Sequence, residues 1–268
     1  MASFEEKRVA LGSHLSSLQK VLVAFSGGVD STLLLKVAFD TLGENVLAVT
    51  ADSPSVPRRE LAEAGRIAGE IGARHLVVQT SEIDNNNYAS NPINRCYFCK
   101  VELYTRLFEV ADHEDIRYVA NGTNTDDLGD YRPGLQAADE HKVVSPLRDA
   151  GLTKDDVRNL ARKLGLPIWD KPASPCLSSR IPYGSSVTHE KLAMIEAAES
   201  ILKALKSKEL RVRHFGVKAR IEVPASDFSL LRSHLHVVEE RFKAIGFDEI
   251  ELAEFRSGAL NSQIRSLT

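Results

Sequence analysis

The residues with the clearest chemical meaning lie at positions 26–31. They read Ser-Gly-Gly-Val-Asp-Ser and directly follow the apolar residues 21–25. A helical pattern of apolar residues begins at once after them, so the sequence predicts a strand, a tight loop and a helix. Gly27 and Gly28 allow a sharp turn and the close approach of a ligand to the backbone. Backbone N–H groups at the start of a helix bind phosphate, so this segment predicts a phosphate site.

Two common phosphate loops do not fit this segment. No Lys-Ser or Lys-Thr pair closes the turn, which excludes a Walker A loop, and the glycine spacing excludes the dinucleotide fingerprint. The segment resembles the pyrophosphate loop (PP-loop) of the N-type ATP pyrophosphatases, which cleave ATP between the α and β phosphates and adenylylate an acceptor oxygen. The ordinary alternative is a helix start that happens to carry two glycines.

The three cysteines form a second feature. Cys96 and Cys99 make a C-x-x-C pair, and Cys176 lies far along the chain. The pair alone fits a redox dithiol, whereas zinc would need a histidine as fourth ligand. Three thiolates also suit a 4Fe–4S cluster in which the fourth iron is open to an external sulfide. Three buried structural cysteines are the remaining alternative, which the polar residues around all three disfavour.

The composition restricts the class of protein. The chain has 268 residues, of which 43% are hydrophobic and 26% charged, as in ordinary globular proteins with more than one domain. A net charge of −3 gives no general attraction for nucleic acid. The first residues lack an apolar signal core and no long apolar run occurs, so we expect a cytoplasmic protein without a membrane partner.

Alternating patterns predict the elements that position the loop and the cysteines. We expect strands at 21–25, 45–50, 74–79, 117–120 and 143–147, and helices at 4–20, 29–42, 57–71, 100–112 and 153–165. Strands that alternate with helices predict an α/β fold with a parallel, doubly wound sheet. Ligands bind at the carboxyl ends of such strands, where the polar loops after residues 50 and 120 lie.

A Pro- and Ser-rich stretch at residues 171–180 marks the junction to a second domain. Beyond it we expect helices at 189–206 and 226–245, a hairpin of residues 210–214 and 218–223, and a strand at 247–252. The sequence therefore predicts an ATP pyrophosphatase domain at 1–170 and a smaller α+β domain at 171–268. We expect the second domain to bind substrate and to contribute to a homo-oligomer.

Five segments together carry a more specific resemblance. They are residues 26–31, 122–127, 130–134, 176–184 and 255–258. With them the chain resembles, over nearly its whole length, the LarE family of ATP-dependent sulfur transferases. That family acts in the biosynthesis of the nickel-pincer nucleotide, the cofactor of lactate racemase.

The resemblance implies a reaction. A carboxylate of a pyridinium dicarboxylate mononucleotide is adenylylated with release of pyrophosphate and then converted to a thiocarboxylate with release of AMP. Some members of the family sacrifice the sulfur of one cysteine, whereas members with a C-x-x-C pair and a later cysteine resemble cluster-dependent enzymes. The chain matches the second type, although Cys176 lies near the sacrificial position of the first. The sulfur source, sulfide on a cluster or the thiol of Cys176, stays open.

The same resemblance implies roles for particular residues. ATP and Mg²⁺ would be held by the loop and by residues beside it: Ser26, Gly27, Gly28, Asp30 and Ser31, with Gly122 and Asp126, Asp30 binding the metal. The iron–sulfur ligands would be Cys96, Cys99 and Cys176, the last of these also a catalytic candidate. Lys100 and Arg180 could neutralise charge on the transferred phosphate, or could be surface cations.

The smaller domain offers two further candidate sites. Arg211 and Arg213 lie on one face of a strand, because strand side chains alternate, and with Ser179 they fit the substrate's phosphate. A solvated basic strand face is the alternative. Glu199, Glu222 and Asp227 resemble a second metal site, for which solvated carboxylates are the ordinary reading.

Other functions fit parts of the pattern. A cluster-dependent tRNA thiolase uses the same loop, but usually adds an RNA-binding module and a basic surface. An amidotransferase or ligase of the same superfamily would not need the three cysteines. The non-enzyme alternative is an ATP-binding iron–sulfur scaffold, which formation of AMP and pyrophosphate from ATP would exclude.

Overall fold

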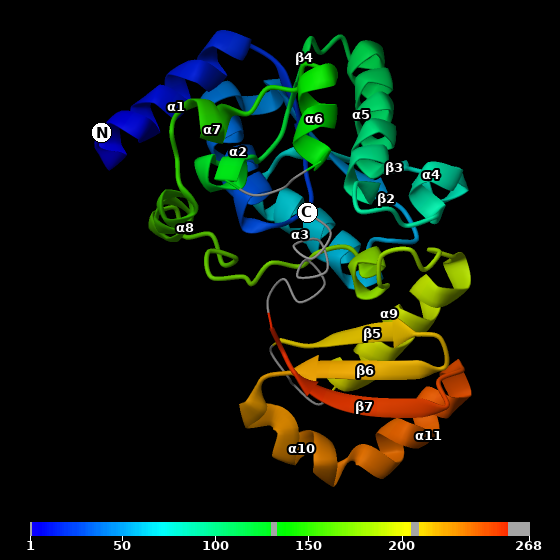
Figure 1. Cartoon of the computed structure of the whole chain (residues 1–268). Coiled ribbons are helices and arrows are strands. Elements are labelled where there is room, and N and C mark those ends of the chain that lie inside the picture. Colours follow the sequence, from blue (N-terminus) through cyan, green and yellow to red (C-terminus); the bar gives the residue numbers. More distant parts are fainter. Residues whose placement is uncertain (1, 130–132, 205–208, 257–268) are drawn as a thin grey trace. The chain divides into compact units, whose positions relative to one another are not determined.

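The computed structural model describes residues 2–129, 133–204 and 209–256, and the chain divides into two compact units (Figure 1). The first unit comprises Met1–Glu82 and Asn94–Ser174, and the second comprises Ile83–Ile93 and Pro175–Thr268. The division proposed from the sequence, after residue 170, did not place Ile83–Ile93 with the second part. Parts of two family segments, residues 130–132 and 257–258, lie outside the described residues.

The first unit is built on a parallel sheet with the strand order β3-β2-β1-β4. Its strands are β1 (Val21–Ala24), β2 (Val46–Asp52), β3 (Arg74–Gln79) and β4 (Tyr118–Ala120). The strand expected at 143–147 is reduced to a single parallel bridge between Val144 and Ala120. Pro146 begins the short helix α7 (Pro146–Asp149) two residues later, and a proline has no N–H with which to extend a ladder.

Helices cover both faces of this sheet (Figure 1). Val21 and Val23 face a core shared with helices α1 (Phe4–Leu18), α2 (Val29–Leu42), α3 (Arg58–Ile71) and α8 (Lys154–Lys163). Leu22 faces the other core, shared with α5 (Arg95–His113) and α6 (Pro133–Glu140). This alternation, with apolar side chains of β1, β2 and β4 buried in both cores, confirms the predicted doubly wound α/β sheet.

Two further features of the first unit differ from the sequence prediction. Helix α6 was not expected, and α5 begins at Arg95 rather than after Lys100. The C-x-x-C pair therefore lies in the first turns of a helix and not in a loop.

Short 3-10 helices occur in both units: η1 (Gly43–Asn45), η2 (Glu82–Asp84), η3 (Thr125–Gly129), η4 (Leu177–Arg180) and η5 (Ala225–Asp227).

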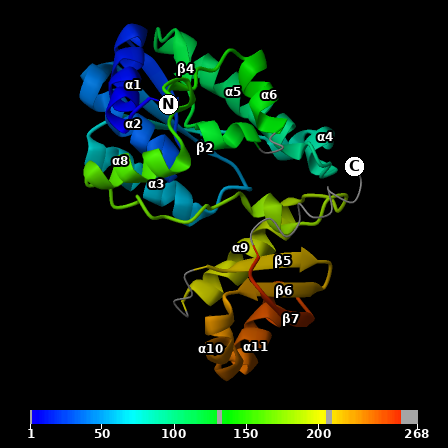
Figure 2. The ribbon, with the colours of Figure 1, turned by 60° about the vertical axis from the view of Figure 1, so that its left-hand side comes forward.

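The second unit is a mixed three-stranded sheet with helices packed beside it (Figure 2). Its elements after η4 are α9 (His189–Lys203), β5 (Arg211–Phe215), β6 (Lys218–Val223), α10 (Phe228–Ser233), α11 (Leu235–Ile245) and β7 (Glu249–Glu254). β5 and β6 form the predicted hairpin, and β7 lies parallel to β6. The single helix expected at 226–245 is two helices, which meet at His234.

The segment 83–93 belongs to the second unit because its side chains are bound there. It contains the short helix α4 (Asn86–Ala89). The amide of Asn91 donates to the carbonyl oxygens of Ile181, Pro182 and Ser185 at 3.3, 2.7 and 2.9 Å. The hydroxyl of the buried Tyr88 lies 2.6 Å from the hydroxyl of Ser178. These bonds attach the segment to the chain that follows Cys176.

Candidate active site

The loop between β1 and α2 needs glycine at one position for its own structure. Gly27 has φ +68°, and a Cβ there would lie 3.1 Å from Cα of Ala64 on α3. Gly28 has an ordinary extended conformation, and its Cβ would contact only Oγ of Ser26, at 3.4 Å. The protein alone therefore requires Gly27, and an alanine at position 28 would fit sterically.

The two serines of the loop hold its shape. Oγ of the buried Ser31 donates to the carbonyl oxygen of Gly28 at 3.2 Å and accepts from N–H of Ser26 at 3.3 Å. No side chain caps the start of α2. The first N–H groups of this helix can therefore bind a phosphate oxygen, as the sequence predicts.

Gly122 brings a second loop against the start of α2. It follows β4, and a Cβ at this position would lie 2.8 Å from the backbone N of Ser31. Any larger residue would push the two loops apart. Asn121 is buried beside it and is held by Tyr104 and Ser145, with distances of 3.2 and 2.9 Å. The loop after β4 is thus fixed at the proposed phosphate site.

Asp30 lies where this second loop meets α8. Its Oδ1 accepts from the amide of Asn124 at 3.0 Å, and its Oδ2 accepts from Nζ of Lys154 at 2.5 Å. The backbone N of Lys154 in turn donates to Oδ2 of Asp126 at 2.9 Å. The structure therefore brings the predicted Asp30, Gly122 and Asp126 together and adds Asn124 and Lys154. Sequence reasoning assigned Lys154 only to the helix expected at 153–165.

The two cysteines of the first unit lie at the start of α5. Cys96 is exposed and Cys99 half-buried, and the helix start has no side-chain cap. The N-terminal end of a helix favours a thiolate, which suits metal ligation or redox chemistry. Lys100 follows them, with Nζ 5.7 Å from the centre of the Tyr104 ring. Cys176 belongs to the second unit, so joint ligation by the three cysteines stays a prediction.

Arg180, which was expected either to neutralise charge on the transferred phosphate or to be a surface cation, is buried in an ion pair. Only 4% of the residue is exposed, and its Nε and Nη2 donate to the carboxylate of Glu199 at 2.8 and 3.2 Å. Its Nη1 donates to the carbonyl oxygens of Pro175 and Cys176 at 2.6 and 3.2 Å. Because all three nitrogens are bound within the protein, Arg180 fixes the backbone at Cys176 and is not available to a phosphate.

Arg211 and Arg213 have different environments. Arg213 is buried, and it donates to the carboxylate of Glu222 at 3.0 Å and to the carbonyl oxygen of Ser179 at 2.8 Å. Arg211 is half-buried and lies 5.1 Å from the centre of the Phe255 ring. Burial, together with the positive charges of Arg180 and Arg213, lowers the pKa of Arg211 to about 10. Arg211 is therefore the better candidate for binding an anion.

The second metal site expected at Glu199, Glu222 and Asp227 does not form. Glu199 and Glu222 are buried and accept hydrogen bonds from Arg180 and Arg213, which offset their charges. Within residues 2–129, 133–204 and 209–256, no three His, Cys, Asp or Glu side chains are grouped so that they could hold a metal ion. Glu199 and Glu222, which lie on separate elements, are thus ion-pair partners and not metal ligands.

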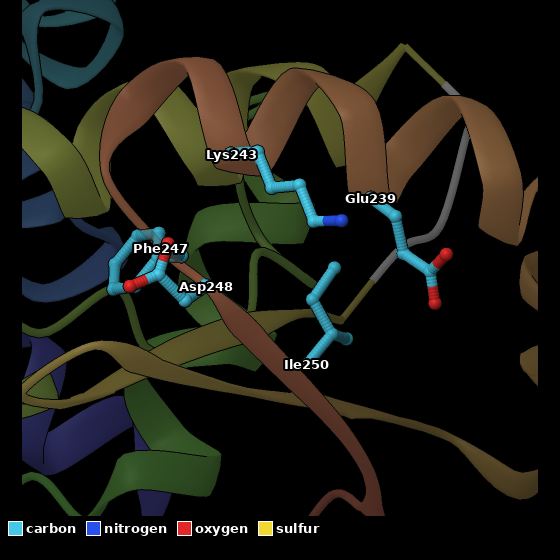
Figure 3. Close-up of a pocket in the computed structure, with 5 residues that line it drawn as sticks. All are labelled: Glu239, Lys243, Phe247, Asp248 and Ile250. Atoms are coloured by element: carbon cyan, nitrogen blue, oxygen red, sulfur yellow. The ribbon is translucent and has the colours of Figure 1, made fainter.

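Two hollows lie outside the predicted site residues. One in the first unit has a volume of about 560 Å³ and includes Lys171, whose Nζ donates to Glu60 and Glu63 at 2.8 Å and to the carbonyl oxygen of Gly27 at 3.4 Å. The other, of about 150 Å³, lies in the second unit between α11 and the start of β7 (Figure 3). Its lining residues are Glu239, Lys243, Phe247, Asp248 and Ile250.

Comparison with known proteins identifies the fold of the first unit and its relatives. The model of the arginosuccinate synthase N-terminal HUP domain matches residues 20–167. An uncharacterized protein of Synechocystis sp. is 46% identical over 96% of this chain and 97% of its own length. The pyridinium-3,5-bisthiocarboxylic acid mononucleotide synthase of Lactiplantibacillus plantarum is 38% identical over 98% of this chain and 97% of its own.

A more distant relative shares less of the chain. One of the subunits of the glutamine-hydrolyzing GMP synthase of Archaeoglobus fulgidus is 27% identical over 68% of this chain and 64% of its own length. In the part of the chain that the structure describes, no helix combines the length and the apolar character needed to cross a membrane.

Proposed function

Because the chain belongs to the family of the pyridinium-3,5-bisthiocarboxylic acid mononucleotide synthases and its residues 20–167 match a HUP domain, we propose that it is an ATP-dependent sulfurtransferase of nickel-pincer nucleotide synthesis. It adenylylates a carboxylate of a pyridinium dicarboxylate mononucleotide, releases pyrophosphate, and then forms the thiocarboxylate with release of AMP. The observation that carries the proposal is the assembly of the loop at 26–31 with Gly122 and Asp126 around the uncapped start of α2.

This assembly suits adenylylation for a physical reason. The N–H groups of the loop and of α2 stabilise the charge that develops on the leaving pyrophosphate. Asp30 would hold Mg²⁺, which would offset the charge of the phosphates. The fit is supported by the contact between Oδ2 of Asp30 and an ammonium group, since this oxygen already accepts a cation as neighbour.

The mononucleotide substrate carries a phosphate of its own, for which Arg211 is the proposed ligand. Arg213 and Glu222 brace the strand beside it, and Ser179 accepts from Arg213 through its carbonyl oxygen. The hydroxyl of Ser179 accepts from Nη1 of Arg180 at 2.9 Å and keeps its own proton for a phosphate oxygen. We therefore assign Arg211 and Ser179 to phosphate binding and Arg213 to positioning.

For the sulfur source we propose that Cys96, Cys99 and Cys176 ligate a 4Fe–4S cluster. Three thiols are the donor set that leaves one iron without a protein ligand, and the start of α5 favours two of them as thiolates. Such a cluster would hold a sulfide and deliver it to the activated carboxylate. Arg180 would hold the backbone at Cys176 through its hydrogen bond to the carbonyl oxygen of Cys176. Lys100 follows Cys99 directly and would place a positive charge beside it.

The test is an anaerobic reconstitution with iron and sulfide, followed by an assay with ATP and the mononucleotide. We expect an iron–sulfur absorbance and several thiocarboxylates per protein molecule, with one AMP and one pyrophosphate for each. Replacing any one of the three cysteines by Ala should remove the absorbance and the repeated turnover. A single turnover with loss of sulfur from Cys176 alone, and full activity of Cys96→Ala and Cys99→Ala, would contradict the cluster and leave the adenylylation intact.

Two further expectations remain proposals. A cytoplasmic location agrees with a reaction that consumes ATP, and a homo-oligomer would be recognised by light scattering of the purified protein. AMP formation that depends on tRNA rather than on the mononucleotide would instead favour a tRNA thiolase.

A further inference from the structure

A lysine that no sequence pattern identified lies at the centre of the candidate ATP site. Lys154 is the first residue of α8, and its Nζ is 2.5 Å from Oδ2 of Asp30. Asp30 is also the carboxylate that we propose for Mg²⁺. The ammonium group of Lys154 is therefore in contact with Oδ2 of Asp30, the oxygen that a divalent cation would need.

The backbone of Lys154 is held in place from two sides. Its N–H donates to Asp126 at 2.9 Å, and a capping box of Thr153 and Asp156 fixes the first turn of α8. Lys7 from α1 binds Asp156 at 2.6 Å. These contacts anchor the backbone of Lys154, so an ammonium group that leaves Asp30 remains within a side-chain length of the loop.

The carboxylate of Asp30 keeps its orientation without the lysine. Its other oxygen, Oδ1, accepts from the amide of Asn124, and Asn124 is buried at 2% exposure. Asn124 is in turn fixed by its backbone N–H, which donates to Asp127 at 3.0 Å. Release of the ammonium group would thus leave Oδ2 pointing to the same place and open to a metal ion.

We propose that Lys154 makes metal binding at Asp30 depend on the nucleotide. The ammonium group competes with a divalent cation for Oδ2, because two cations at this distance repel each other strongly. The phosphates of ATP offer the ammonium group an alternative partner, so metal and nucleotide bind together and each one alone binds poorly. This inference rests on the proposed function, in which Asp30 is the metal ligand.

The experiment measures binding and not activity. Mn²⁺, which electron paramagnetic resonance detects, is titrated with and without the ATP analogue whose α and β phosphates are joined by a methylene group. In the unmodified protein we expect tight Mn²⁺ binding only with the analogue. Lys154→Met should bind Mn²⁺ alone roughly tenfold more tightly and the analogue roughly tenfold more weakly, since one unit charge is removed beside each. Lys154→Gln, which keeps a polar group, should behave in the same way.

Lys163→Met is the matched control, because Lys163 lies in the last turn of the same helix and contacts Glu5 and Phe4 instead. It should leave both affinities unchanged. If Lys154→Met and Lys154→Gln bind Mn²⁺ alone no better than the unmodified protein, the competition does not exist. If these two variants bind the analogue as tightly as the unmodified protein does, the ammonium group does not move to the phosphates and that part of the proposal is wrong. If Asp30→Asn retains nucleotide-dependent Mn²⁺ binding, the metal assignment of the proposed function fails, and the inference with it.

Discussion

Breaking the ion pair of Arg180 and Glu199 should destabilise the second unit strongly. Both side chains are almost fully buried, with 4% and 2% of the residues exposed. In Arg180→Met, Glu199 loses both of its guanidinium donors and keeps only the backbone N–H of Val212, at 3.2 Å. An uncompensated buried charge of this kind costs about 3–5 kcal/mol. The carbonyl oxygens of Pro175 and Cys176 lose a donor in addition, which adds to the cost.

The double variant separates the lost pair from the lost packing. In Arg180→Met/Glu199→Met no buried charge remains, and replacement of a buried pair by apolar side chains is often close to neutral. We therefore expect the double variant to be more stable than Arg180→Met alone by about 2 kcal/mol or more, measured as the free energy of unfolding in urea. If the double variant loses as much unfolding free energy as Arg180→Met and Glu199→Met lose together, the reasoning is refuted.

A second measurement tests whether Arg180 also orders Cys176. With Cys96 and Cys99 replaced by serine, the rate of alkylation by iodoacetamide reports on Cys176 alone. Arg180→Met should raise this rate severalfold under conditions in which the protein is folded, because the backbone at Cys176 loses its donor. An unchanged rate would show that Arg180 acts on stability only.

Three further predictions concern other parts of the molecule. Gly122→Ala should cost about 1–3 kcal/mol of unfolding free energy because its Cβ would overlap the start of α2, whereas Gly28→Ala should keep its stability and lose ATP affinity; equal losses of stability would contradict the steric argument. Arg211→Gln should weaken binding of the mononucleotide at least about tenfold and leave ATP binding unchanged in calorimetry, and a parallel loss of both would remove its assignment. Burial lowers the pKa of His75 and of His214, so the unfolded chain binds protons more readily than the folded protein. The unfolding free energy should therefore be highest above the ordinary histidine pKa of about 6.5, fall as the pH drops through this value and become constant below the folded-state pKa values. If His214→Phe keeps the full pH dependence in urea unfolding, His214 does not contribute to it.

The sequence predicted those parts of the site that are close together in the chain. The loop at 26–31 was recognisable because the strand, the glycines and the helix are contiguous, and β1 and β2 because their residues are apolar and buried on both faces. Lys154 was not recognisable, because its partner Asp30 is 124 residues away and its own surroundings indicate only the start of a helix. The same reason applies to Arg180, whose charge suggested a ligand until the burial of Glu199 beside it was known.

The attachment of residues 83–93 to the second unit has a consequence for the order of events during synthesis. Tyr88 and its partner Ser178 are 90 residues apart, and the carbonyl oxygens that bind Asn91 belong to residues that are made later still. At the usual elongation rates a nascent chain needs roughly 5–20 s to make that many residues, and until then the Tyr88 hydroxyl lacks its contact with Ser178. All four strands of the first sheet are therefore made before residues 83–93 can form their contacts with the second unit. The contacts that hold residues 83–93 in the second unit therefore form only after Ser178, Pro182 and Ser185 have been made.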